Sequence, residues 1–65
     1  MNEKATAAFI EQTCKTRSVL REISNRIDDH LGIGPEEVNW GHVNLMRWIC
    51  SSLDEILAEI NGEEV

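Results

Sequence analysis

The segment GIGPEEVNWG covers residues 32–41 and separates two long helical patterns. It contains three of the four glycines and the only proline of the 65-residue chain. Glycine and proline are the strongest local breakers of regular structure. On either side of the segment there is no internal repeat and no strand-like alternation of useful length. The sequence therefore predicts an all-α protein with one long helix on each side of this segment.

The first helix is predicted over residues 3–31, from an apolar stripe at 4-3-4-3 spacing. This spacing is typical of one face of an amphipathic helix. The stripe consists of Phe9, Thr13, Thr16, Leu20, Ile23, Ile27 and His30, flanked by Ile10, Val19 and Leu31. Asn2 is the predicted N-cap, because its side chain can accept a backbone N–H of the first turn. Gly32 is the predicted residue after the last turn, where a positive φ is common.

The second helix is predicted over residues 40–61, and its apolar stripe is the stronger of the two. The stripe consists of Met46, Ile49, Cys50, Leu53, Ile56, Leu57 and Ile60. Asn39 is the predicted N-cap. Gly62 is expected to end the helix, with residues 62–65 as a frayed tail.

A short helical turn is predicted over residues 35–38. Pro35 is followed by Glu36 and Glu37, and proline with acidic residues behind it is a helix-start signal. The rival interpretation is one helix that runs on from Pro35. Gly41 disfavours it, because glycine inside a helix costs about 1 kcal/mol relative to alanine.

Charge and composition exclude several classes of protein. The chain has 12 acidic and 6 basic side chains, a net charge of −6. Residues 1–32 sum to zero, so the whole net charge lies in residues 33–65. The basic footprint of nucleic-acid binding is absent, and no apolar run approaches the roughly 20 residues of a membrane span. We expect a soluble cytoplasmic protein, of the small acidic kind common in bacterial and phage genomes, with neither nucleic acid nor membrane as partner.

The two helices are expected to pack as an antiparallel hairpin, because short connections join antiparallel neighbours. The chain forms one domain, residues 1–65, and is shorter than the roughly 70–80 residues at which one core supplies comfortable stability. It is therefore predicted to form a homodimeric four-helix bundle. The predicted dimer and core residues are Phe9, Ile10, Leu20, Ile23, Ile27, Met46, Ile49, Leu53, Ile56 and Ile60.

Leu45 and Trp48 share a second face of the second helix, away from the main stripe. One interpretation is packing against the connection or against the dimer mate. The other is a binding surface for a partner protein, since tryptophan is enriched at interface hot spots. Both remain open from the sequence.

The sequence predicts no catalytic, cofactor or metal site, and hence no enzyme. His30 and His42 have acidic neighbours, but the HxxxH and CxxC spacings typical of zinc sites are missing. Cys14 and Cys50 are expected to be buried structural thiols without a disulfide, because small disulfide scaffolds carry four or more cysteines.

In size, helical-hairpin layout and acidic tail the chain resembles the Rop family of plasmid RNA-binding proteins, which are dimeric four-helix bundles. Ala8-Phe9-Ile10 followed by a polar-rich helix is similar to the first helix of that family, whereas the connection here is longer. The resemblance implies an RNA-binding face on Lys4, Lys15, Arg17 and Arg21. These residues do not form one stripe, because Lys15 points away from Arg21. The preferred hypothesis is a non-enzymatic interaction or regulatory protein, with Rop-like RNA binding as the alternative.

Overall fold

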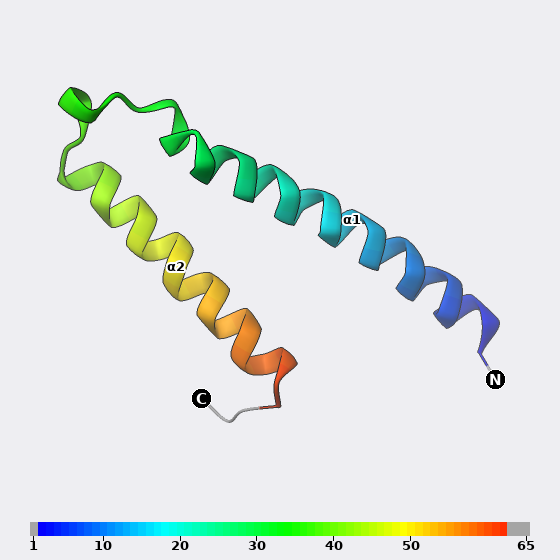
Figure 1. The fold of residues 1–65 in the computed structure, drawn as a ribbon. Coiled ribbons are helices and arrows are strands. Elements are labelled where there is room, and N and C mark those ends of the chain that lie inside the picture. The colour runs from blue at the N-terminus through cyan, green and yellow to red at the C-terminus, as the bar shows by residue number, and fades with distance from the viewer. Residues whose placement is uncertain (1, 63–65) are drawn as a thin grey trace. The chain divides into compact units, whose positions relative to one another are not determined.

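The computed structural model describes residues 2–62, which form two long helices, α1 (Glu3–Asp28) and α2 (Trp40–Ile60) (Figure 1). Two short 3₁₀ helices, η1 (His30–Gly32) and η2 (Pro35–Glu37), lie between them in the chain. Residues 2–62 contain no strand. The predicted all-α class and the two-helix layout are therefore confirmed.

Helix α1 begins on the predicted cap. The Oδ1 atom of Asn2 accepts the backbone N–H of Ala5 at 3.0 Å, and Asn2 itself has an extended backbone. One of the four unpaired N–H groups of the first turn is thereby satisfied. Glu3 places a negative charge in the same turn, where the helix dipole favours it.

The end of α1 differs from the prediction. The helix stops at Asp28 rather than near Leu31, and the chain takes positive φ angles at His30 (54°), Leu31 (56°) and Gly32 (71°). Gly32 is thus the third left-handed residue and not the first. Two backbone hydrogen bonds stabilise the turn. The Gly32 N–H donates to the Asp29 carbonyl and the Ile33 N–H donates to the His30 carbonyl, both at 3.0 Å. The predicted helix was too long because His30 continues the 4-3-4-3 spacing of the apolar stripe beyond the residue at which the helix ends.

The connection contains the predicted short helical turn, with Pro35 at its start. Glu37 N–H donates to the Gly34 carbonyl at 2.9 Å. Val38 and Asn39 then have extended backbones, so α2 starts afresh at Trp40. The rival interpretation of one helix from Pro35 is therefore wrong.

Helix α2 begins with a reciprocal cap. Asn39 Oδ1 accepts the His42 backbone N–H at 3.2 Å, and His42 Nδ1 accepts the Asn39 backbone N–H at 3.2 Å. In the usual form of this capping box the second partner is Glu or Gln. Here an imidazole takes that place, so two backbone donors are satisfied by a pair three residues apart.

We expect Asn39→Ala and His42→Ala each to lower the free energy of unfolding by about 1 kcal/mol, because each leaves a backbone donor of this cap without its partner. In a chain of this size that loss shifts Tm by about 4–8 °C. Thermal unfolding followed by circular dichroism measures it. His42→Gln is the matched control, since its side-chain oxygen can still accept the Asn39 N–H. Equal losses for His42→Gln and His42→Ala would contradict a capping role for the ring.

The end of α2 agrees with the prediction. Asn61 N–H donates to the Leu57 carbonyl at 3.0 Å, and Gly62 N–H donates to the Glu59 carbonyl at 3.1 Å. Gly62 has a φ of 74°, the left-handed conformation that glycine adopts without steric cost. The predicted frayed tail lies outside the described residues, apart from Gly62.

The chain divides between Ile33 and Gly34 into two compact units, each containing one long helix. None of the described residues is buried. Over residues 2–62, neither helix combines the length and the apolar character that crossing a lipid bilayer requires. The single domain, the antiparallel packing and the four-helix bundle remain predictions.

Candidate interaction faces of the two helices

Helix α1 carries a narrow apolar face, called here the α1 stripe. It consists of Phe9, Thr13, Thr16, Leu20, Ile23 and Ile27. At about 100° per residue these positions fall within an arc of about 80° that contains no charged residue. Ile23 and Ile27 are half-buried, whereas Phe9 is 73% exposed. The stripe is therefore a continuous apolar surface with its N-terminal half open.

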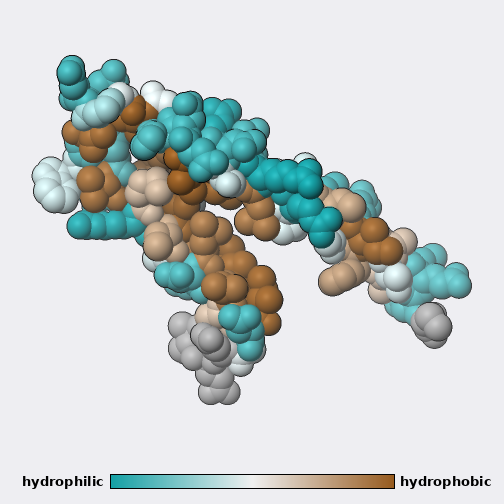
Figure 2. All heavy atoms as spheres, in the orientation of Figure 1, coloured by the Kyte–Doolittle hydropathy of each residue, from teal (hydrophilic) through white to brown (hydrophobic). Residues whose placement is uncertain are grey.

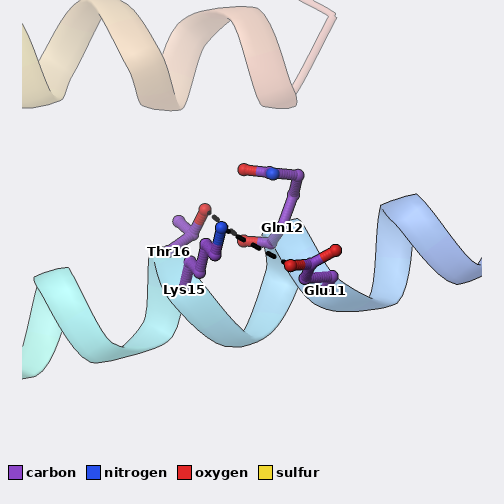
Figure 3. A network of polar contacts seen from close by, with 4 residues as sticks. All are labelled: Glu11, Gln12, Lys15 and Thr16. Carbon is purple, nitrogen blue, oxygen red and sulfur yellow. Dashed lines mark hydrogen bonds and ion pairs between the residues drawn. The ribbon is translucent and has the colours of Figure 1, made fainter.

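The two threonines of the α1 stripe have no unpaired hydroxyl. Thr13 Oγ1 donates to the Phe9 carbonyl at 2.8 Å. Thr16 Oγ1 donates to the Gln12 carbonyl at 2.7 Å, and Figure 3 shows this second bond. Each hydroxyl is thus satisfied within its own helix, an arrangement open to Ser and Thr in helices. Covering the stripe would therefore leave no hydroxyl donor unsatisfied, and the methyl groups could pack as apolar surface.

The opposite side of α1 carries paired charges. Lys15 Nζ lies 3.5 Å from Glu11 Oε1 (Figure 3), and Arg26 Nε lies 3.3 Å from Glu22 Oε2. Both pairs are well exposed and have the i,i+4 spacing, so each contributes only about 0.3–0.5 kcal/mol. Lys15, one of the four residues of the RNA-binding face that the Rop resemblance implies, therefore already has an anionic partner.

Helix α2 carries a broader apolar face, called here the α2 face. It consists of Leu45, Met46, Ile49, Cys50, Leu53, Ile56, Leu57 and Ile60. These positions span an arc of about 140° at about 100° per residue, again without a charged residue. Figure 2 shows the apolar side chains gathered along this helix. An arc of this width exceeds the narrow seam of a two-stranded coiled coil and suits a helix covered by more than one neighbour.

The ten predicted dimer and core residues are all at least partly open to solvent in the single chain. Half-buried are Ile23, Ile27, Met46, Ile49 and Leu53. Exposed are Phe9, Ile10, Leu20, Ile56 and Ile60. Ile10 lies about 100° around α1 from Phe9 and hence outside the stripe. Their burial in a dimer remains a prediction.

Trp48 lies outside the α2 face. Its position is about 60° around the helix from Leu45, and Glu55 and Glu59 lie within about 20° of it. Trp48 is 66% exposed and Leu45 is 44% exposed. The two predicted partner-binding residues are therefore both exposed. Leu45 lies at the border of the apolar arc, and Trp48 lies on the same side of α2 as Glu55 and Glu59, about two and three turns before them.

Two contacts of α2 were not predicted. The guanidinium carbon of Arg47 lies 5.9 Å from the ring centroid of Trp40, a cation–π geometry. The i,i+7 spacing of the pair is the sequence signal for it. His42 is the second case, and its signal is the position three residues after the Asn39 cap.

Arg47 is the only Lys or Arg of α2, so Glu55 and Glu59 have no cationic partner on their own helix.

Cys14 and Cys50 are both free and exposed in the single chain, so the predicted burial of the two thiols is not met there. Within residues 2–62, no group of three His, Cys, Asp or Glu side chains is placed to hold a metal ion.

No protein-family model, curated protein or solved structure matches this chain.

Proposed function

We propose that this protein is a non-enzymatic interaction protein that works as a homodimer, two copies of its helix pair forming a four-helix bundle. One observation carries the proposal: no described residue is buried, although both helices have continuous apolar faces. A helix with one apolar face must bury it against another element. Two copies of a two-helix hairpin supply four such faces, which a four-helix bundle can cover together.

Helix energetics support the same proposal. Isolated helices are marginally stable in water, and most of their stability in proteins comes from packing an amphipathic face. The caps of α1 and α2 add about 1 kcal/mol each. The apolar faces must therefore provide most of the stabilisation, about 25 cal/mol for each Å² removed from water.

The proposed activity of the dimer is to bind another protein, in the cytoplasm. Trp48 supports this part, because an exposed tryptophan outside the apolar arc is available for a partner after the arc is covered. The net charge of −6 and the Glu11–Lys15 pair disfavour RNA as that partner.

Light scattering and sedimentation equilibrium test the dimer. We expect a mass of twice 7.4 kDa at micromolar concentration, and a loss of helical circular dichroism on dilution, because folding and association are coupled in small obligate dimers. A folded monomer whose helicity does not change with concentration would overturn the proposal. Salt-dependent retention of RNA during purification would favour the RNA-binding alternative instead.

A further inference from the structure

We propose that Leu45, Trp48, Glu55 and Glu59 form a docking face on α2 for a cationic amphipathic segment of a partner protein. This inference rests on the proposed function and specifies the chemistry of the partner. The four residues are called here the Trp48 face.

The positions of Trp48, Glu55 and Glu59 around the helix keep these three residues available in a bundle, whereas Leu45 lies at the border of the covered arc. The apolar arc begins at Leu45 and runs away from Trp48, which lies about 60° beyond that border. Glu55 and Glu59 lie within about 20° of Trp48 around the helix, about two and three turns further along it, so a bundle contact that covered this side of α2 over its length would draw both carboxylates out of water. Buried carboxylates without partners are strongly unfavourable. The charged neighbours therefore argue against the bundle core as the place of Trp48.

The charges of the Trp48 face select the partner. Glu55 and Glu59 lie one turn apart, and like charges at this spacing repel. Neither has a Lys or Arg within four positions along the helix, and Arg47 is stacked on Trp40. A Lys or Arg of a partner would relieve this repulsion, while an anionic segment would increase it. Complementary charge of this kind determines partner choice and association rate.

The face also has a length and a direction. Its apolar part, Leu45 and Trp48, comes first along α2, and its acidic part, Glu55 and Glu59, follows. From Leu45 to Glu59 the helix rises about 21 Å at about 1.5 Å per residue. A partner helix of about four turns matches this length if it has an apolar side chain at one end and Lys or Arg at the other.

The test measures binding of labelled model peptides to the full chain by fluorescence anisotropy. The probe is an 18-residue helical peptide with leucines at one end of one face and lysines at the other, and its counterpart has glutamates in place of the lysines. The protein variants are Trp48→Ala and Glu55→Gln/Glu59→Gln. The matched control is Glu36→Gln/Glu37→Gln, which changes the net charge equally but lies in η2.

We expect the lysine peptide to bind and the glutamate peptide not to bind. Trp48→Ala and Glu55→Gln/Glu59→Gln should each raise Kd about tenfold or more, as for hot-spot residues and paired charges, while Glu36→Gln/Glu37→Gln should leave Kd nearly unchanged. Equal losses for the two glutamine pairs would indicate unspecific charge attraction and overturn the proposal. Absence of lysine-peptide binding, or equal binding of the glutamate peptide, would also overturn it.

Light scattering on the same samples separates the two proposals. If the wild type and the variants stay dimeric but the lysine peptide does not bind, the Trp48 face is refuted and the dimer stands. If the wild type is a folded monomer, the proposed dimer fails, whatever the peptides do. If Trp48→Ala itself dissociates the dimer, Trp48 belongs to the contact between copies and the docking face is refuted.

Discussion

Leu53→Asp is expected to turn the dimer into a largely unfolded monomer. Leu53 lies near the middle of the apolar arc of α2 and is already half-buried in the single chain. In the proposed bundle the new carboxylate would lie in the core without a partner, a situation that costs about 3–5 kcal/mol. Both copies carry the change, so the total penalty is comparable to the 5–15 kcal/mol stability of a typical small protein. Sedimentation equilibrium measures the loss of the dimer, and far-UV circular dichroism measures the loss of helix in the same samples.

Ser51→Asp is the matched control for Leu53→Asp. It adds the same charge to the same helix, at an exposed position about 160° around from Leu53. We expect a dimer with a melting temperature only slightly below that of the wild type, the small loss coming from repulsion with Glu55 one turn away. If Leu53→Asp stays as dimeric and as helical as Ser51→Asp, the arc of α2 is not the dimer core.

Thr13→Val combined with Thr16→Val is expected to tighten the dimer about a hundredfold. Both hydroxyls donate to carbonyls of their own helix, so their removal leaves no partner in another element unpaired. Each valine exposes a methyl group in place of the hydroxyl, and burying such a group yields about 0.8 kcal/mol. Over two sites in two copies the free energy of dimerisation becomes more favourable by about 3 kcal/mol, which lowers the dimer Kd about a hundredfold. Sedimentation equilibrium over a dilution series measures the change.

The control for the threonine pair is Ser18→Val, which adds apolar surface on the side of α1 opposite the stripe. It should leave the dimer Kd within about twofold, because surface substitutions usually change stability by less than 0.5 kcal/mol. If the threonine double variant has the same Kd as the wild type, the middle of the α1 stripe stays in solvent and another surface joins the copies.

The two long helices were predictable from local sequence because their signals are local. Asn2 and Asn39 each stand directly before the first residue of a helix, and in each case the side chain caps the first turn. Gly62 follows the last periodic residue of α2 and takes the left-handed conformation expected there. Capping and periodicity depend on residues within a few positions of one another, so sequence spacing alone can identify them.

The end of α1 was not predictable in the same way. Apolar spacing continues through His30, but the backbone leaves the helix after Asp28 and turns left-handed for three residues. Side-chain periodicity reports which residues share a face if the helix continues. It does not report whether the backbone does continue, and His30 and Leu31 have no residue-type signal for a positive φ of the kind that glycine gives.

The candidate faces were predictable as sets of residues, whereas their occupants were not. The α2 face follows from spacing, but what covers an apolar face depends on surfaces of other molecules. The sequence identifies Leu45 and Trp48 as a second face of the helix, and the place of Trp48 on the same side as Glu55 and Glu59 follows once the bounds of α2 are fixed. The Trp40–Arg47 stacking depends on side-chain rotamers, about which residue spacing says little.

The cap of α2 also fixes the tautomer of His42. Because Nδ1 accepts the Asn39 amide proton, the neutral ring must carry its own proton on Nε2. Nδ1 then accepts the Asn39 N–H with its lone pair, and Nε2 carries the ring proton. Neither nitrogen has a free lone pair with which to bind a metal ion or accept a proton from a substrate. The ring offers any neighbouring molecule a hydrogen-bond donor, and a change of tautomer would leave the Asn39 N–H without its acceptor while the Asn39 side chain still capped the first turn.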